Sequence, residues 1–196
     1  MKETNKDHND AREPLVLTWE EQSRLLQALP DYLAIPVLFA LNTGLREQEV
    51  LSLKWEELET DDRLGEYCIR ETSKNGKKFP IVLNHTAHRI LDSLRGNRSE
   101  YIFLNATGRN LKTINKAKFQ IVRRDLHLKH RVHDLRHTFA HRLRVAEVPF
   151  EDIQVLMGHV NKTMTEHYAQ ADILHLLECV RRIEQPTESV TLRGLR

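Results

Sequence analysis

The segment VHDLRHTFAHRLRVAEVPFEDIQVLMGHVNKTMTEHY, residues 132–168, carries the pattern around which the rest of the chain is organised. It contains histidines, an arginine and a tyrosine at spacings that allow them to converge on one anion. His133 and Arg136 are three residues apart, so on a helix they lie on the same face. Tyr168 ends the segment and is a candidate nucleophile, although a tyrosine near a helix end most often serves packing.

Apolar spacing in and after this segment predicts four helices. The predicted ranges are 134–145, 149–158, a short helix from about residue 162 that carries Tyr168, and 171–183. Because Gly158 ends the second of them, His159 is expected in the turn that follows. The last helix has an apolar stripe, which can pack on its own domain or dock on a neighbouring molecule.

Charge is distributed unevenly along a chain that is long enough for one domain. The 196 residues have a formal net charge of only +2, so the overall balance does not indicate a nucleic-acid binder. Between residues 109 and 131, however, eight basic residues accompany a single acid, Asp125, for a local net charge of +7. This run is either a solvated helix face or a surface for phosphate backbones.

The two cysteines, Cys68 and Cys179, are far apart and form no C-x-x-C pair, which favours a reducing, cytoplasmic setting. No apolar run reaches the roughly 20 residues that cross a bilayer. The polar N-terminus also lacks the apolar core of a signal peptide. We therefore expect a cytoplasmic protein that does not associate with membranes.

The N-terminal part of the chain begins with residues 1–13, which are polar and are predicted to be disordered. Thr18 and Glu21 have the spacing of a capping box, and the leucines after them predict a helix over residues 18–29. A polar tail, residues 185–196, is expected at the other end. These boundaries leave one folded domain over residues 14–184.

A second predicted helix has Pro36 in its first turn, where proline is tolerated. Gly44 is expected to close it, because glycine accepts the left-handed conformation at a helix C-terminus. Arg46 follows two residues later and is placed at the start of the next short helix.

The period then changes from helical to extended. Tyr67 to Ile69 and Phe79 to Leu83 predict strands, and the Asn75-Gly76 dipeptide between them is a strong hairpin signal. The turn would hold Lys74 at the projecting end of a hairpin, either to reach into a groove or as an ordinary solvated turn residue. Further helices are predicted over residues 85–94 and, in the basic run, over about 112–126. The fold class is therefore α+β, mainly helical, with a small antiparallel sheet.

Three motifs carry a resemblance to a known family. TGLREQEVLSLKW (residues 43–55) supplies Arg46, TSKNGKKFPIVL (residues 72–83) supplies Lys74, and the segment quoted first supplies the rest. Together they resemble the catalytic domain of tyrosine recombinases, the family of phage integrases and Xer-type resolvases, over about residues 17–168. The resemblance implies that DNA is cut and rejoined through a 3′-phosphotyrosyl bond without metal or other cofactor.

The resemblance also assigns roles to matching positions. Arg46 and Arg136 resemble two arginines that clamp the phosphate, and planar guanidinium groups suit that task. Lys74 resembles a general acid, His133 a proton-accepting or orienting histidine, and His159 a donor to a phosphate oxygen. Tyr168 resembles the nucleophile, and Glu49 fits an acidic position that supports the clamp. Because the basic run lies just before the motif with His133 and Arg136, we expect it to contact DNA phosphates. Its DNA-binding residues are predicted to be Lys112, Lys116, Lys118, Arg123, Arg124, Lys129 and Arg131.

By the same resemblance the partner is double-stranded DNA, and the chain would be a monomer when free and a tetramer on DNA. Family members hold DNA between this domain and a preceding core-binding domain, which this sequence is expected to lack. The chain is then an excised catalytic domain, a natural truncation, or a DNA-binding remnant that does not recombine. A type IB topoisomerase is the alternative enzyme.

Two local features depart from the simplest interpretation. His133, His137 and His141 recur every four residues, which also suits a metal, but no H-E-x-x-H spacing accompanies them, and we expect no metal. One of His137 and His141 is expected to be buried and hydrogen-bonded. Glu147 stands where the family generally has a small turn residue, so that turn is expected to be strained or reshaped.

Overall fold

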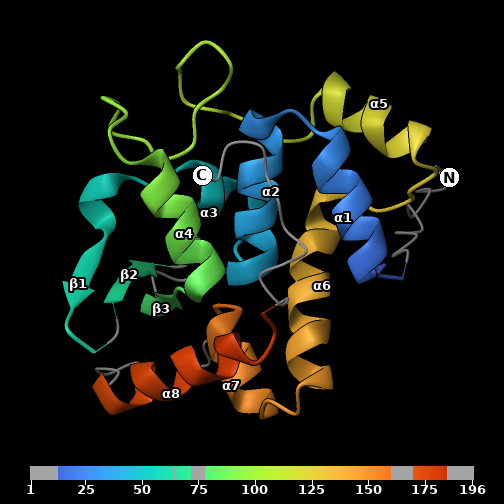
Figure 1. The fold of residues 1–196 in the computed structure, drawn as a ribbon. Coiled ribbons are helices and arrows are strands. Elements are labelled where there is room, and N and C mark those ends of the chain that lie inside the picture. The colour runs from blue at the N-terminus through green and yellow to red at the C-terminus, as the bar shows by residue number, and fades with distance from the viewer. Residues whose placement is uncertain (1–12, 64, 72–77, 160–169, 185–196) are drawn as a thin grey trace, which may run out of the picture.

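The computed structural model describes residues 13–63, 65–71, 78–159 and 170–184 (Figure 1). A three-stranded sheet lies on one side, most of the helices lie on the other, and the last helix crosses beneath them. The elements are α1 (Trp19–Ala28), α2 (Asp31–Thr43), α3 (Glu47–Leu51), the 3-10 helix η1 (Trp55–Glu57), β1 (Glu59–Asp61), β2 (Gly65–Glu71), β3 (Lys78–Val82), α4 (His85–Leu94), α5 (Ala117–Asp125), α6 (Val132–Val145), α7 (Phe150–Leu156) and α8 (Gln170–Arg181). The predicted fold class is confirmed.

The first helix begins as its sequence predicts. The Thr18 hydroxyl accepts from the backbone N–H of Glu21, and the Glu21 carboxylate accepts from the N–H of Thr18, which completes the capping box. The second helix begins earlier than expected, at Asp31, directly after Pro30. Pro36 is therefore inside the helix and not in its first turn, where we had placed it. Its missing N–H costs one helical hydrogen bond, but the side chain is buried in the core.

The sheet has the order β1-β2-β3, and both pairings are antiparallel. Tyr67 pairs with Val82 and Ile69 with Pro80, so the predicted pairing of these two stretches is confirmed. β1 was not distinguished as a separate strand in the sequence. The turn at Asn75-Gly76, with Lys74, lies outside the described residues.

The basic helix is shorter than predicted, because α5 begins at Ala117 and not near Lys112. Residues 113–115 are held in a loop by a side chain from another element. The Glu47 carboxylate of α3 accepts hydrogen bonds from the Thr113 hydroxyl and from the backbone N–H groups of Ile114 and Asn115. This loop therefore lies against the short helix that Arg46 caps.

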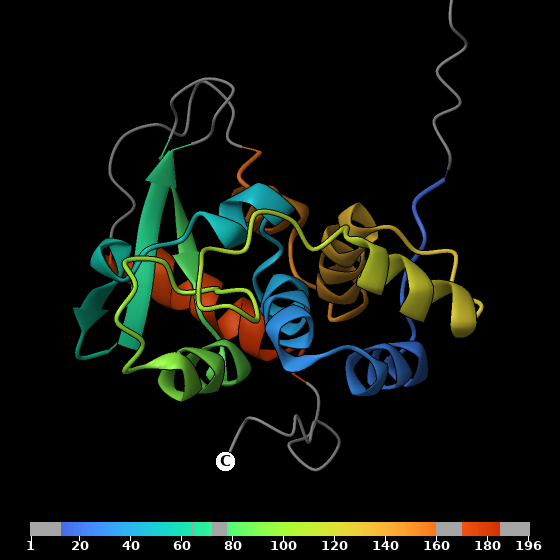
Figure 2. The ribbon, with the colours of Figure 1, turned by 90° about the horizontal axis from the view of Figure 1, so that it is seen from above.

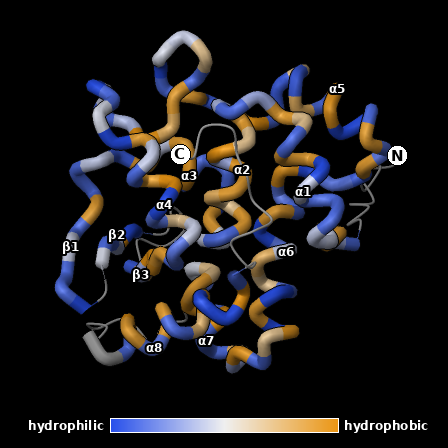
Figure 3. Tube along the Cα trace, in the orientation of Figure 1, coloured by the Kyte–Doolittle hydropathy of each residue, from blue (hydrophilic) through white to orange (hydrophobic). Residues whose placement is uncertain are grey.

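Two apolar clusters form the core. One is built mainly from α1, α2, α4 and α5 and the segments between them, and the other joins α6, α7, α8 and the end of β3. From above, α8 passes under the sheet (Figure 2), and hydrophobic and hydrophilic residues alternate along it (Figure 3). None of the helices within the described residues is long and apolar enough to span a membrane.

Candidate active site

The turn between α2 and α3 positions Arg46. Gly44 ends α2 with a φ of +67°, and a Cβ at this position would lie 2.3 Å from Cδ1 of Phe139. Only glycine therefore lets α2 approach α6 this closely. Arg46 is the N-cap of α3, and Glu49 accepts from its backbone N–H at 2.8 Å and from its Nη1 at 2.9 Å. The carboxylate thus fixes both the backbone and the guanidinium of Arg46.

Arg136, which extends from the first turns of α6, is buried with 3% of its surface exposed. Its Nη1 donates to the carbonyl of Gly44 at 2.6 Å, and its Nη2 donates to the carbonyl of Met157 and to Nε2 of His159, the latter at 3.1 Å. One guanidinium therefore ties together the α2–α3 turn, the end of α7 and His159. Three of the five N–H groups of Arg136 make these bonds.

Positive charge is concentrated at this point. The pKa of Arg136 is lowered to about 10, chiefly by burial and then by the charge of Arg46, while Glu49 acts in the opposite direction. The guanidinium groups of Arg46 and Arg136 repel each other and, among the described residues, only one carboxylate, that of Glu49, lies nearby, so binding of an anion beside them is favourable. The arrangement is therefore chemically suited to hold a phosphate.

His159 follows the turn at Gly158, as the sequence predicts. Gly158 has a φ of +62°, and a Cβ there would lie 3.2 Å from the Phe79 ring, so the chain turns closely over β3. An arginine N–H can only donate, so Nε2 of His159 accepts and its proton is on Nδ1. Burial, Arg136 and Arg46 lower the pKa of His159, which is consistent with a neutral ring.

His133 is at the N-terminal end of α6, one helical turn before Arg136. Its ring packs edge-on against His137, with 4.7 Å between centroids. Burial lowers the pKa of His133, and His137, Arg136 and Arg46 add to the effect while Asp134 opposes it. Arg46 thus acts electrostatically on Arg136, His133 and His159 alike. His137 is only half-buried and His141 is exposed, so neither is the buried histidine that we expected.

Sequence reasoning missed Arg70, a positioning residue in β2. Its Nη1 donates to the backbone carbonyl of Glu49 at 2.6 Å, its Nη2 to the Ser52 hydroxyl at 3.1 Å, and its Nε lies 3.0 Å from the Glu57 carboxylate. These bonds attach α3 to the sheet. The only signal in the sequence is an arginine within a strand, which does not identify its partners.

The basic run is mostly at the surface. Arg123 differs, because it donates to the carbonyls of His130 and Lys129 and to Gln120, and so it supports the chain around α5. The Nε atom of Arg124 lies 3.3 Å from Oδ1 of Asp125. The exposed members are Arg109, Lys112, Lys116, Lys118, Arg124, Lys129 and Arg131.

Two of the predicted catalytic residues, Lys74 and Tyr168, lie outside the described residues. The structure brings together Arg46, Glu49, Arg136 and His159, with His133 nearby in the same electrostatic environment. Their roles in a reaction remain predictions at this point.

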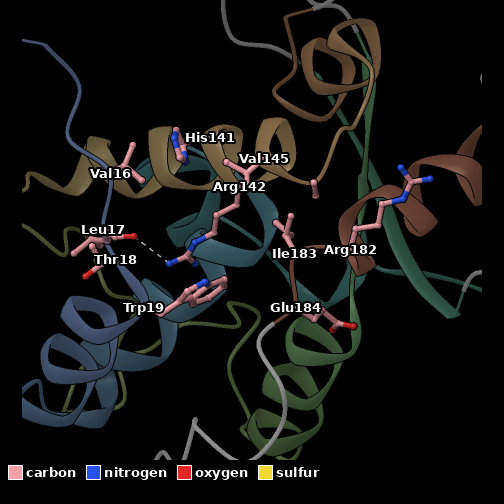
Figure 4. A pocket seen from close by; sticks show the side chains of 11 residues that line it. Val16, Leu17, Thr18, Trp19, His141, Arg142, Val145, Arg182, Ile183 and Glu184 are labelled. Atoms are coloured by element: carbon pink, nitrogen blue, oxygen red, sulfur yellow. Dashed lines mark hydrogen bonds between the residues drawn. The ribbon is translucent and has the colours of Figure 1, made fainter.

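A groove of about 740 Å³ lies elsewhere on the molecule, between α1, the second half of α6 and the end of α8 (Figure 4). Trp19, Arg142, Val145 and Ile183 are among the side chains that line it. The Arg142 guanidinium stacks on the Trp19 ring at 3.5 Å from the centroid. None of the residues of the arginine and histidine cluster lines this groove, so we do not assign it to the active site.

Comparison with protein families matches residues 16–175 to the phage integrase family. The integrase of Salmonella phage P22 is 29% identical over 177 residues, which cover 84% of this chain and 46% of that protein. The tyrosine recombinase XerC of Caldanaerobacter subterraneus is 31% identical over 193 residues, covering 87% of this chain and 51% of the relative. The chain therefore spans about half the length of these relatives.

Solved structures show the same fold. A lambda integrase fragment, in a dimer bound to a COC′ core site, matches with a TM-score of 0.62 at 24% identity, covering 80% of this chain and 61% of that one. A lambda integrase tetramer bound to a Holliday junction matches with a TM-score of 0.61 at 23% identity, covering 79% of this chain and 49% of that one.

Proposed function

The chain belongs to the phage integrase family of tyrosine recombinases, and from this premise we propose that residues 14–184 form the catalytic domain of a site-specific DNA recombinase. Its substrate is double-stranded DNA. The phenol oxygen of Tyr168 attacks the scissile phosphorus, a 3′-phosphotyrosyl bond forms, and the bond to the 5′ oxygen breaks. Rejoining reverses these steps, so the phosphodiester energy is conserved.

The observation that carries this proposal is the set of bonds made by Arg136. A buried guanidinium is held by Gly44, Met157 and His159, and it lies within the electrostatic reach of Arg46. Such a preorganised positive site stabilises the charge on the non-bridging oxygens as the pentavalent transition state forms. The N–H groups of Arg136 that do not bond these three partners, and the guanidinium of Arg46, would bind those oxygens.

The histidines supply complementary functions. With its pKa lowered, His133 is neutral near pH 7 and can accept the phenolic proton of Tyr168. His159 uses Nε2 to accept from Arg136, which leaves Nδ1–H to donate to a phosphate oxygen. Lys74 would protonate the leaving 5′ oxygen.

The basic run supports DNA binding beside this site. Glu47 holds residues 113–115 against α3, so Lys112 and Lys116 lie at the ends of a loop that contacts the helix capped by Arg46. Contacts with phosphates from Lys112, Lys116, Lys118, Arg124, Lys129 and Arg131 would make binding strongly dependent on salt. We further propose a cytoplasmic, DNA-associated protein that is a monomer when free and a tetramer on DNA.

Covalent attachment to DNA tests the proposal. The chain is incubated with a pool of duplex DNAs whose core sequence is randomised. Each duplex carries a nick, so that cleavage near the nick releases a short fragment, rejoining is prevented and the covalent adduct accumulates. We expect a band on a denaturing gel that disappears in Tyr168→Phe and persists in the matched control Tyr67→Phe. Sequencing the attached DNA should show a preferred site.

Two outcomes would contradict this function. Attachment without sequence preference, together with relaxation of unrelated supercoiled plasmid, would indicate a type IB topoisomerase. Salt-dependent binding by folded protein that never yields a tyrosine-dependent adduct would indicate a DNA-binding module.

A further inference from the structure

Three side chains that can bind a metal meet where α7 and α8 pack together. Asp152 is in the first turn of α7, while His175 and Cys179 are four residues apart on α8 and so share a face. His175 Nε2 lies 2.8 Å from Asp152 Oδ2 and 3.8 Å from Cys179 Sγ. Their ligand atoms all lie within 4.8 Å of one another.

These separations fit a tetrahedral ion. Zinc bonds of about 2.0–2.2 Å to nitrogen and oxygen and about 2.3 Å to sulfur place neighbouring ligand atoms roughly 3.3–3.7 Å apart. The observed 2.8 and 3.8 Å lie on either side of that range and the third pair lies within 4.8 Å, so side-chain rotations would bring all three ligand atoms to one ion. The combination of thiolate, imidazole and carboxylate favours zinc over magnesium or calcium, which prefer oxygen alone.

The burial of the three residues also fits such a site. Cys179 is buried, whereas His175 and Asp152 have 49% and 22% of their side-chain surface exposed. An ion can therefore enter from solvent, and water can occupy the fourth position. Within the described part of the chain, Cys68 and the histidines of α6 belong to no comparable group.

We propose that Asp152, His175 and Cys179 form a zinc-binding site that joins α7 to α8. On binding, Cys179 releases its proton to solvent, so the thiolate and the carboxylate balance the two charges of the ion. The ion would fix the two helices that flank residues 160–169 in the chain, and α7 also leads into His159. This inference does not depend on the recombinase proposal.

Cobalt provides the test, because a Co²⁺–thiolate bond has a charge-transfer band in the near ultraviolet. The full chain, stripped of metal and kept reduced with a phosphine, is titrated with Co²⁺ and then with Zn²⁺. We expect the band to saturate at one Co²⁺ per chain and to disappear with one equivalent of Zn²⁺. Zn²⁺ should also raise the unfolding midpoint.

Variants identify the ligands. His175→Gln, at an exposed position, should stay folded and lose the Zn²⁺-dependent rise in the midpoint, and Cys179→Ser should lose the band. The matched control Cys68→Ser, which changes a buried cysteine in β2, should retain both. The proposal fails if the folded wild type shows no band, if Cys179→Ser keeps the band, or if the Zn²⁺-dependent rise in the midpoint survives His175→Gln.

Discussion

Nη2 of Arg136 lies 3.1 Å from Nε2 of His159, and the arginine must be the donor. The bond joins the second turn of α6 to His159, three residues beyond the end of α7 and 23 positions from Arg136 in the chain. It also fixes the tautomer of His159 before any substrate binds. The free protein therefore already holds a donor array of the kind that a phosphate requires.

Arg136→Lys should abolish most activity although it keeps the charge. An ammonium group cannot bond the carbonyls of Gly44 and Met157 and the His159 ring in the same geometry. We expect adduct formation to fall by about 10²-fold or more, the usual effect of losing a preorganised oxyanion donor. The measurement is the initial rate of covalent attachment, made on protein shown to be folded.

Arg142→Lys is the matched control on the same helix. Arg142 is also buried, and it donates to Gln22 at 2.7 Å and to the Leu17 carbonyl at 3.4 Å, away from the cluster. Its replacement should lower the free energy of unfolding by about 1–3 kcal/mol and leave the rate of the folded fraction unchanged. Equal rate losses in the two variants would contradict a specific role for Arg136.

Stability should depend on pH through His133 and His159. Their pKa values in the folded protein are below the ordinary value of 6.5, so below pH 6.5 the unfolded chain binds protons that the folded chain does not. The stability gained from keeping these two rings neutral is complete above pH 6.5, and it is lost as the pH falls through their pKa values in the folded protein. Urea unfolding across this range should show a shallower slope against pH for His133→Gln and His159→Gln than for wild type.

His141→Gln, at an exposed position on α6, is the control for the loss of a histidine side chain from this helix. The rate of attachment should fall over the same range, because both histidines act as neutral rings. Retention of the full rate at a pH where the rings are protonated would contradict the proposed roles.

Local signals in the sequence predicted the elements that local chemistry determines. The capping box at Thr18, the glycine ends of helices at Gly44 and Gly158, and the paired strands β2 and β3 all form where expected. The start of α5 could not be predicted, because Glu47, some 66 residues earlier, holds the preceding loop. Tertiary contacts of this kind override helical propensity.

The candidate site shows the same difference between what local sequence signals predict and what tertiary contacts determine. The resemblance pointed to Arg46, Arg136 and His159, which the structure brings together, but it did not identify what holds them. Arg136 is bonded to two backbone carbonyls, and a carbonyl carries no residue-type signal. Arg70 was missed for a similar reason, since it supports α3 through the backbone of Glu49.

Gly44→Ala should destabilise the protein and disturb the site. A non-glycine residue at positive φ costs about 1–3 kcal/mol, and here the new Cβ would also overlap the Phe139 ring, with overpacking adding roughly 1–3 kcal/mol. Gly108→Ala is the matched control, because its φ is +73° and nothing lies within 4 Å of the added Cβ. Chemical denaturation should show a larger loss in the free energy of unfolding for Gly44→Ala than for Gly108→Ala. Similar losses in the two variants would exclude the close approach of Gly44 to Phe139.

Glu147→Gly should stabilise the protein. Glu147 has a φ of +56°, which confirms the strained turn expected from the sequence, and the bonds from Glu147 N to Arg144 O and from Val148 N to Leu143 O form a Schellman motif. Glycine relieves about 1 kcal/mol of left-handed strain, partly offset by its greater freedom in the unfolded chain. Thermal unfolding should show a higher midpoint for Glu147→Gly, whereas Glu147→Ala keeps a Cβ and should show no gain. A gain of equal size in the alanine variant would trace the effect to the lost carboxylate instead of the backbone.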